Sequence, residues 1–173
     1  MNGQVRTGGG TGPGGAPRRA AACLDEPSLA AWAGELGRAA VRHGAFVCLH
    51  GPLGAGKSTV VRAACRGAGV KGVVPSPTFT LVTRHRTPDG TEIQHADLYR
   101  IESPALLTEA GWPELLESAG AVFVEWAERA GPHLPAERWE VHLSFAAEPD
   151  RRRVEVRRAG GAPPLPAPGG GSC

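Results

Sequence analysis

A short stretch from Gly51 to Thr59 carries the residue types that bind a chain of phosphates. Its sequence, GPLGAGKST, fits the pattern of Gly, four residues, Gly-Lys and then Ser or Thr. Glycines at these positions let backbone N–H groups turn toward phosphate oxygens, and a helix that follows points its positive N-terminal end at the same anion. Lys57 would reach the β- and γ-phosphates, and the Ser58 hydroxyl is placed to bind Mg²⁺. The stretch therefore predicts a nucleotide site.

The residues around this stretch support the match. Lysine is rare in the chain, where only Lys57 and Lys71 occur. Residues 45–49 form an apolar run suited to a buried parallel strand, and residues 57–66 have the pattern of a helix. The motif requires this order of strand, loop and helix; the alternative is a glycine turn that merely connects the two elements. We predict that the nucleotide is bound by Gly51, Leu53, Gly54, Ala55, Gly56, Lys57, Ser58 and Thr59.

Two acidic residues at the ends of expected strands could complete a metal site. Glu125 follows the apolar residues 121–124, and Asp97 follows residues 93–96. Hydrolysis of a phosphoanhydride needs Mg²⁺ between the terminal phosphates, and this metal takes the loop hydroxyl plus an acidic group from a neighbouring strand end. We assign Ser58 and Glu125 to the metal, and Asp97 to orienting the metal water or the attacking water. The alternative is that each acid faces solvent or caps the next helix.

Three further residues have weaker signals. His95 precedes Asp97 by two positions, so on a strand both side chains lie on one face. His95 could support the metal site. The favoured interpretation is that it packs in the core with its ring nitrogens hydrogen-bonded. Ser76 and Thr78 lie in a loop that could order around the γ-phosphate, and ordinary turn hydroxyls are the alternative.

Composition limits the domain organisation and the class of partner. The formal net charge is +2, and the basic residues form short Arg clusters, so direct nucleic-acid binding is not expected. Residues 1–20 are Gly-rich and residues 159–173 are Gly- and Pro-rich, and both segments are predicted to be disordered tails. We expect one nucleotide-binding domain over residues 21–158.

The cysteines and the apolar runs bear on the compartment. Cys23, Cys48, Cys65 and Cys173 show no metal-ligand spacing, and we expect reduced, packed thiols of a cytosolic protein. No apolar run approaches the length of about 18 residues that a membrane span needs. The N-terminus lacks the apolar centre of a signal peptide. We therefore expect a soluble, cytoplasmic protein.

The remaining pattern predicts the elements that hold the loop. Ser28 is the expected N-cap of an amphipathic helix that ends near His43 and Gly44, with Trp32 in the core. A turn at residues 87–90 predicts a hairpin, and Ser103 and Pro104 open a short helix. The expected strands cover residues 45–49, 78–83, 91–97, 121–125, 138–145 and 151–158, and a second short helix lies within residues 113–120.

Two other nucleotide-binding classes fit less well. A guanine-specific GTPase would carry an Asn-Lys-x-Asp motif, but the only asparagine is Asn2. A small-molecule kinase shares the phosphate loop, and residues 151–153, three arginines, could form its lid. Because these arginines begin an expected strand, a solvated hairpin face is the better interpretation. The kinase remains the alternative function, and a nucleotide-gated binding module that binds ATP without hydrolysing it is a second rival.

Four motifs together resemble the TsaE (YjeE) family, the bacterial ATPases of tRNA threonylcarbamoyladenosine biosynthesis. They are the loop at residues 51–59, SPTFTLV at 76–82, HADLYR at 95–100 and VEWAER at 124–129. They occur in the family's order and spacing, and the likeness runs from about Asp25 to Val156. The resemblance implies an α/β P-loop NTPase fold with a central mainly parallel sheet, flanking helices and antiparallel hairpin additions.

The resemblance also implies an activity and partners. Members of the family bind ATP and Mg²⁺ and have weak ATPase activity alone. They act with the threonylcarbamoyl transferase subunit and its dimerising partner protein, which attach threonylcarbamoyl to position 37 of tRNAs that read ANN codons. Hydrolysis is expected to reset that complex between turnovers, so contact with tRNA would be indirect and no membrane would be involved.

Site residues carry over where the motifs match. Lys57 resembles the phosphate-gripping lysine, Ser58 the metal-binding hydroxyl and Glu125 the second metal ligand. Asp97 matches the catalytically important aspartate, and Trp126 matches the tryptophan beside the acidic ligand. The predicted catalytic residues are therefore Lys57 and Asp97.

Two positions near the loop bear on nucleotide binding. The segment around Asp25 and Glu26 falls where relatives of this family approach the adenine. Pro52 departs from the family, which usually has Asp there. Because proline fixes φ and contributes no side-chain acceptor, this departure affects the early hydrogen bonding of the loop.

Overall fold

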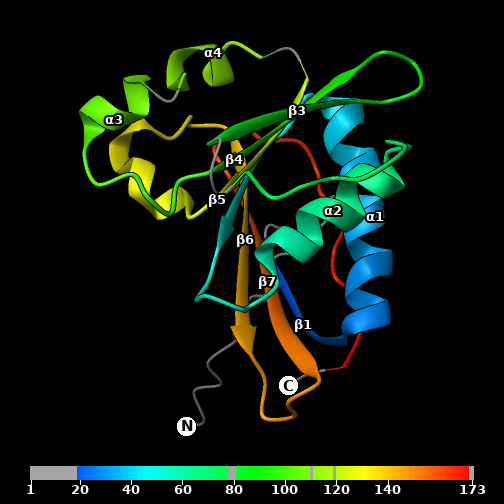
Figure 1. Cartoon of the computed structure of the whole chain (residues 1–173). Coiled ribbons are helices and arrows are strands. Elements are labelled where there is room, and N and C mark those ends of the chain that lie inside the picture. The colour runs from blue at the N-terminus through cyan, green and yellow to red at the C-terminus, as the bar shows by residue number, and fades with distance from the viewer. Residues whose placement is uncertain (1–18, 78–80, 110, 119, 172–173) are drawn as a thin grey trace, which may run out of the picture.

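A seven-stranded sheet forms the middle layer of the protein, with the strand order β1–β7–β6–β2–β5–β4–β3 (Figure 1). The structure is a computed structural model that describes residues 19–77, 81–109, 111–118 and 120–171. Strands β6, β2, β5 and β4 run parallel, and β1, β7 and β3 pair antiparallel with their neighbours. The strands are β1 (Arg19–Asp25), β2 (Phe46–His50), β3 (Val82–Arg86), β4 (Glu92–Asp97), β5 (Ala121–Glu125), β6 (Arg138–Phe145) and β7 (Arg151–Ala159).

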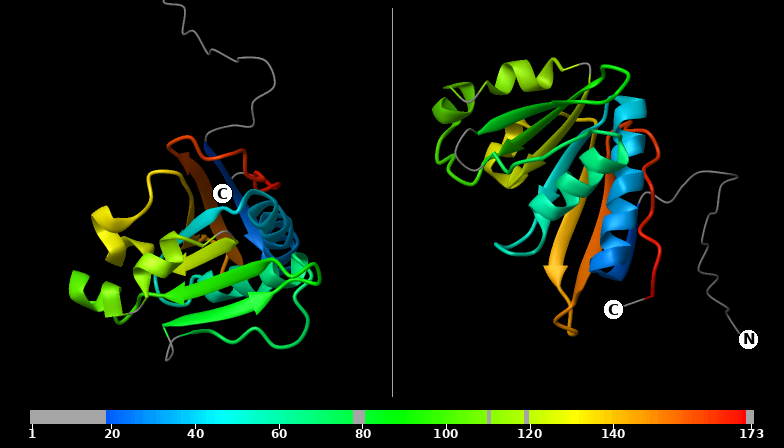
Figure 2. Two further views of the ribbon diagram at one scale, coloured as in Figure 1. Left: turned by 90° about the horizontal axis from the view of Figure 1, so that it is seen from above. Right: turned by 45° about the vertical axis from the view of Figure 1, so that its right-hand side comes forward.

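Helices cover the two faces of this sheet unequally (Figure 2). The long helices α1 (Glu26–His43) and α2 (Lys57–Gly67) pack in one core with residues from all the strands except β3. The short helices α3 (Pro104–Glu109) and α4 (Trp112–Leu116) and the 3-10 segment η1 (Ala127–His133) pack in a second core against β2, β4 and β5. The mixed α/β fold with a mainly parallel centre, flanking helices and antiparallel hairpins is confirmed.

Several predicted elements are confirmed with small changes in their bounds. The apolar run before the loop is β2, the loop leads directly into α2, and the run that ends in Glu125 is β5. The two hairpins are the antiparallel pairs β3–β4 and β6–β7. The strand expected at residues 78–83 is placed later, because β3 begins at Val82; Thr78 lies outside the described residues.

The long helix begins earlier than the sequence predicted. Asp25, rather than Ser28, is the N-cap of α1, and its Oδ1 accepts a hydrogen bond from the Ser28 N–H at 2.9 Å. The expectation for Ser28 is wrong because an acceptor three residues earlier takes that N–H. The predicted end of the helix is confirmed, since Gly44 adopts a left-handed conformation with a φ of 57°.

Close contact between α1 and α2 depends on glycine. A Cβ atom at Gly37 of α1 would lie 2.0 Å from the carbonyl oxygen of Ala64 on α2. A Cβ atom at Gly34, one turn earlier, would lie 3.6 Å from its nearest neighbour, the Cα of Gly67. The helix after the phosphate loop is therefore held against α1 at a distance that only glycine permits at position 37.

Gly37→Ala is expected to destabilise the fold, and Gly34→Ala is its matched control. Overpacking costs about 1–3 kcal/mol, which exceeds the gain of about 1 kcal/mol in helix propensity when glycine becomes alanine. In urea unfolding, the Gly37→Ala midpoint should fall and the Gly34→Ala midpoint should stay equal or rise. A Gly37→Ala midpoint at or above that of the wild type would contradict this account of the helix pair.

The C-terminal segment departs from the disorder that its composition predicted. Residues 160–171 run back along α1 toward β1 (Figure 2). The indole N–H of Trp32 donates to the Pro166 carbonyl at 3.1 Å, and that of Trp139 donates to the Pro163 carbonyl at 2.9 Å. Proline-rich chain packs here because its carbonyls serve as acceptors for two buried indoles that would otherwise lack partners.

The two ends of the described chain also meet at the edge strand β1. The Cys23 N–H donates to the Gly171 carbonyl at 3.0 Å. Cys23 is disulfide-bonded, whereas Cys48 and Cys65 are free thiols. The expectation of reduced cysteines is therefore wrong for Cys23. Strand β1 was not predicted, and residues 1–18 of the expected N-terminal tail lie outside the described residues.

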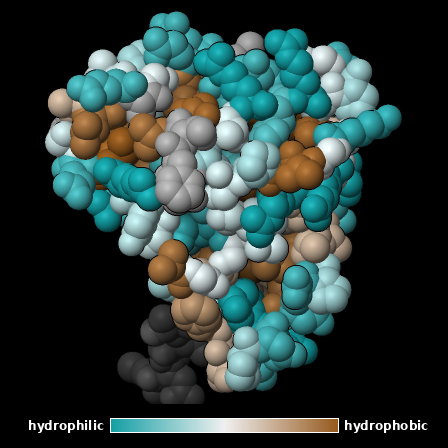
Figure 3. Space-filling view, in the orientation of Figure 1, coloured by the Kyte–Doolittle hydropathy of each residue, from teal (hydrophilic) through white to brown (hydrophobic). Residues whose placement is uncertain are grey.

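Apolar surface is limited on the face shown in Figure 3, where it gathers mainly over the region of α3 and α4. Leu106 of α3 and Leu116 of α4 are among the exposed large hydrophobic side chains.

Within the part of the chain that the structure describes, no helix combines the length and the apolar character that crossing a bilayer would require.

Candidate functional site

The predicted phosphate loop joins the end of β2 to the start of α2. Gly51 has a φ of 139° and Gly56 a φ of 104°, values that side chains disfavour. A Cβ atom at Gly51 would also lie 2.2 Å from the Leu143 carbonyl oxygen of β6. The loop can pass this close to β6 only because its first residue is glycine. The strand, loop and helix that the motif requires are thus present in the expected order.

Lys57 turns back over the loop from the first position of α2. Its ammonium donates to the carbonyl oxygens of Gly51 at 2.6 Å and Pro52 at 3.0 Å. It also lies 3.8 Å from the centroid of the Trp126 ring, which provides a cation–π contact. The Pro52 carbonyl also accepts a hydrogen bond from the Ala55 N–H at 3.2 Å, so the turn at the start of the loop forms with proline at position 52. The ammonium is thus positioned over the centre of the loop.

Lys57 is a buried cation with three carboxylates nearby. Burial lowers the pKa of Lys57, while the negative charges of Glu125, Glu128 and Asp97 act in the opposite direction. The side chain is only 5% exposed. A desolvated ammonium with free hydrogen-bonding capacity interacts strongly with phosphate, because the low local dielectric strengthens charge attraction.

A buried chain of hydrogen bonds links Ser58 to His95. Ser58 Oγ donates to Glu125 Oε2 at 2.9 Å, and the other carboxylate oxygen, Oε1, lies 2.8 Å from His95 Nε2. Glu125 is 3% exposed and His95 is fully buried. An ionised carboxylate can only accept, so His95 donates to it and fixes its orientation. The structure therefore brings together Ser58 and Glu125, the two predicted metal ligands.

The favoured interpretation of His95 as a satisfied packing residue is not supported. One ring nitrogen contacts Glu125, and the other, Nδ1, is buried without a hydrogen-bond partner among the described residues. In a histidine that serves only for packing, both ring nitrogens would be expected to form hydrogen bonds with protein or water. His95 instead supports the carboxylate that pairs with the loop hydroxyl.

Asp97 lies next to Glu125 at the carboxyl ends of two parallel strands. The two residues are directly paired in the β4–β5 register. Asp97 is buried, and its Oδ1 accepts a hydrogen bond from the Tyr99 N–H at 2.9 Å. The Tyr99 ring contacts the Trp126 ring, with centroids 5.1 Å apart. Asp97 therefore neither faces solvent nor caps a regular helix, and it stays close to the loop lysine and Glu125.

Trp126 adopts a strained backbone conformation beside these acids. Its φ of 56° and ψ of 40° lie in the left-handed region, which is uncommon for a bulky residue. This turn directs the chain away from β5 immediately after Glu125 and leaves the indole under the Lys57 ammonium. Composition gave no signal for this role; only the VEWAER motif singled out the residue.

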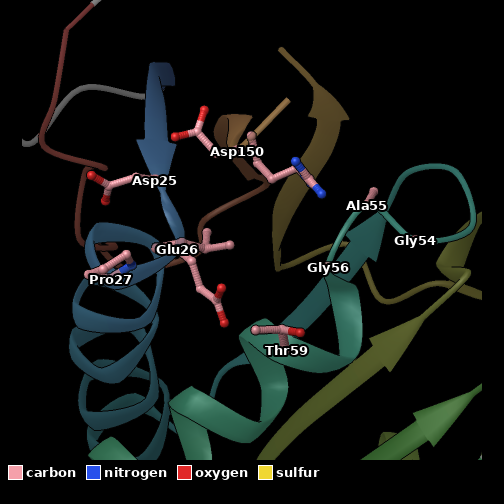
Figure 4. Close-up of a pocket in the computed structure, with 10 residues that line it drawn as sticks. Asp25, Glu26, Pro27, Gly54, Ala55, Gly56, Thr59 and Asp150 are labelled. Carbon is pink, nitrogen blue, oxygen red and sulfur yellow. The ribbon is translucent and has the colours of Figure 1, made fainter. Parts of the chain in front are cut away.

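A cavity of about 520 Å³ opens on the other side of the loop, between the start of α1 and the end of the β6–β7 hairpin (Figure 4). Three acids line this space: Asp25 at the end of β1, Glu26 at the start of α1 and Asp150 in the turn between β6 and β7. Asp150 was not predicted to lie near the loop, and Arg152 was considered there only as part of a kinase lid, because only the fold brings the hairpin end to the loop. The lining residues are Asp25, Glu26, Pro27, Leu29, Gly54, Ala55, Gly56, Thr59, Asp150 and Arg152.

The remaining predicted residues are placed less centrally. Leu53 is 74% exposed at the tip of the loop. Ser76 belongs to the described loop before β3, but Thr78 lies outside the described residues, so its expected contact with a phosphate stays a prediction. Gly54, Ala55, Gly56 and Thr59 line the cavity and flank Lys57 and Ser58 in the chain.

The fold and the site define a mixed α/β protein in which a glycine-rich loop, a lysine and two strand-end carboxylates meet. A family described as "Threonylcarbamoyl adenosine biosynthesis protein TsaE" matches residues 24–154. The chain belongs to the TsaE family.

Relatives from distant bacteria support this assignment, and each is named tRNA threonylcarbamoyladenosine biosynthesis protein TsaE. The Bacillus subtilis protein is 33% identical, over 68% of this chain and 72% of its own length. The Haemophilus influenzae protein is 36% identical over 64% and 68%, respectively. The Treponema pallidum protein is 31% identical over 70% and 88%.

A solved structure shows the same fold. The crystal structure of Bacillus subtilis YdiB superposes with a TM-score of 0.63 and covers 82% of this chain and 86% of its own. The identity is 24%, so this likeness concerns the fold alone.

Proposed function

We propose that this protein is a Mg²⁺-dependent ATPase of the P-loop NTPase class that takes part in forming threonylcarbamoyladenosine at position 37 of tRNAs that read ANN codons. The observation that carries the proposal is the contact of 2.9 Å between Ser58 Oγ and Glu125 Oε2, beside the Lys57 ammonium. The names of the family and of its relatives support the pathway. The ATPase domain would span residues 21–158, and a role in tRNA modification implies the cytoplasm.

The donor atoms present fit Mg²⁺. This ion prefers oxygen ligands and uses few of them from the protein, since it keeps several waters and binds phosphate oxygens. Ser58 and Glu125 offer one hydroxyl and one carboxylate close together, and His95 holds the carboxylate in place. We infer that Ser58 and Glu125 hold the metal, which when bound would neutralise charge between the terminal phosphates.

The shape of the site also fits ATP. The phosphates would lie along Gly51, Leu53, Gly54, Ala55, Gly56, Lys57, Ser58 and Thr59. The adenosine would occupy the cavity of about 520 Å³, where the loop forms one wall and Asp25 and Glu26 form another. Acceptor groups of these acids suit the amino and hydroxyl donors of adenosine.

In this proposal, Lys57 and Asp97 have distinct catalytic roles. Lys57 exchanges its contacts with the Gly51 and Pro52 carbonyls for phosphate oxygens and stabilises the charge that develops on them. Asp97 accepts a hydrogen bond from the attacking water or from a metal-bound water and orients it. The buried position of both side chains strengthens these interactions.

The activity of the isolated chain should be weak. P-loop enzymes gain much of their rate from an arginine that a partner supplies. The threonylcarbamoyl transferase subunit and its dimerising partner protein are the proposed partners, with tRNA reached through them.

Phosphate release with and without these two partner proteins tests the proposal. Wild-type protein should release phosphate from ATP slowly alone, faster with the partners, and not at all when Mg²⁺ is chelated. Ser58→Ala should lose this activity, and Ser118→Ala, at the opposite end of β5, should retain it. A small-molecule kinase, the alternative, would form ADP only with an acceptor and transfer the phosphate to it; that result, or Mg²⁺-independent release, would overturn the proposal.

A further inference from the structure

A second group of side chains suited to metal binding lies on the opposite face of β2 from Leu49. Cys48 and His50 of β2 are paired in register with Glu140 and His142 of β6. Residues two apart on a strand project from the same face, so both pairs point the same way. This face also carries Glu128, which comes from η1. Four residues with S, N or O donors thus project from two adjacent strands.

The donor atoms of three of these residues are close together. Cys48 Sγ, a His50 ring nitrogen and a Glu140 carboxylate oxygen all lie within 4.8 Å of one another. His50 Nε2 lies 2.5 Å from Glu140 Oε2, and the His142 ring stacks on His50 with centroids 4.5 Å apart. Ligands of a tetrahedral ion about 2.0–2.3 Å from the metal stand about 3.5 Å apart, so small side-chain rotations suffice.

We propose that Cys48, His50 and Glu140 form a binding site for a borderline-soft divalent transition-metal ion of the Zn²⁺ type. A thiolate and an imidazole favour such an ion over Mg²⁺, which prefers oxygen ligands. His142 or a water completes the coordination. The site is separate from the Ser58–Glu125 pair, which lies on the α2 side of the sheet, so it does not depend on the proposed ATPase activity.

The groups behind these ligands are arranged as metal sites require. His50 Nδ1 lies 3.0 Å from Glu128 Oε2, which fixes the tautomer and leaves Nε2 for the metal. The second oxygen of Glu140, Oε1, accepts from Arg138 Nε at 2.6 Å. A histidine that donates to a carboxylate, with its other nitrogen toward the ion, is the usual support in protein metal centres.

Without a metal, the same residues form an ion pair. Burial alone would lower the pKa of His50, but hydrogen bonds to Glu128 and Glu140 outweigh it and raise the pKa to about 9. Burial raises the pKa of the Cys48 thiol. An ion pair alone explains why His50, Glu128 and Glu140 lie together, but it gives no role to Cys48. Coordination of a metal by the Cys48 thiolate therefore distinguishes a metal site from a simple ion pair.

Titration of the full-length protein with Co²⁺ tests the proposal, since a Co²⁺–thiolate bond gives a near-ultraviolet charge-transfer band. The band should appear with one equivalent of Co²⁺, persist in excess Mg²⁺ and vanish when Zn²⁺ is added. Cys48→Ser should abolish it. Cys65→Ser should keep it, because Cys65 is also a buried free thiol but lies in α2, away from the site.

Because Cys48 is buried, its replacement can unfold the protein, and two further variants separate loss of metal binding from loss of folding. Glu140→Gln, at a partly exposed position, should lower Co²⁺ affinity at least tenfold with an unchanged circular dichroism spectrum. Glu128→Gln should lower it about 10- to 100-fold. A wild-type protein without a charge-transfer band, or a band of equal strength in folded Glu140→Gln and Glu128→Gln, would overturn the proposed site.

Discussion

Replacing Lys57 with alanine is expected to weaken MgATP binding by about 10- to 150-fold, because a hydrogen bond to a charged group contributes about 1.5–3 kcal/mol. The Lys57 ammonium is the cation that lies over the loop, within 3.0 Å of the Pro52 carbonyl and 2.6 Å of the Gly51 carbonyl. Its removal leaves the loop N–H groups and the helix N-terminus as the remaining contacts with the phosphates. Isothermal titration calorimetry measures this loss directly.

Lys71→Ala is the matched control, since Lys71 is the one other lysine of the chain and is exposed. It removes the same charge from the protein without touching the loop, and its affinity for MgATP should equal that of the wild type. Both variants should also unfold at similar urea concentrations. Unchanged ATP affinity in Lys57→Ala would undermine the entire phosphate site.

Asp97→Asn is expected to reduce partner-stimulated phosphate release by about 100-fold or more while leaving MgATP affinity close to that of the wild type. A positioned acid or base contributes about 10²- to 10⁴-fold to the rate of the chemical step. Asparagine keeps the size of the side chain and an oxygen for the Tyr99 N–H, but it removes the charge that orients water. Single-turnover hydrolysis with excess protein separates the chemical step from binding.

Asp89→Asn is the control for this second prediction. Asp89 lies in the turn between β3 and β4, where its carboxylate bonds to Thr87 and to the Thr91 N–H. The variant should hydrolyse ATP as fast as the wild type. Full partner-stimulated activity in Asp97→Asn would show that Asp97 is not catalytic, and a parallel loss of ATP affinity would show that it acts in binding instead.

The parts of the fold nearest the loop were predictable because their sequence signals are local. Residues 45–49 and 121–125 are short apolar runs. Such a run is the sequence pattern typical of a parallel strand that is buried on both faces. The glycine and lysine spacing determined where β2 ends and α2 begins. Glu125 could be placed beside Ser58 because the carboxyl ends of parallel strands meet at one edge of the sheet.

Elements that depend on distant partners were missed. Strand β1 is rich in alanine, which has a low strand propensity, and it forms because β7 offers a complete antiparallel ladder. Residues 160–171 looked disordered by composition, but two buried indoles, Trp32 and Trp139, bind their carbonyls. The general rule that such sequences cannot bury enough apolar surface fails when the folded core supplies polar partners.

The site shows the same distinction. Asp150 and Arg152 border the cavity from a hairpin that lies far along the chain from the loop, so no spacing rule could find them. His95 was recognised by its position two residues before Asp97, but its bond to Glu125 depends on the β4–β5 register. The spacing of Cys48 and His50 gave no sign of the proposed metal site, because the third ligand, Glu140, lies on a different strand.

The central claim, that ATP hydrolysis by this protein sustains tRNA modification, is tested most directly by multiple-turnover threonylcarbamoyladenosine formation in a reconstituted reaction. With limiting transferase pair and excess tRNA, wild-type protein and ATP should yield several modified tRNAs for each transferase complex. With Lys57→Ala, the reaction should stop after about one modified tRNA for each transferase complex. A non-hydrolysable ATP analogue should have the same effect, provided that the threonylcarbamoyl donor is still supplied. Equal yields under all three conditions, or without this protein, would contradict the account.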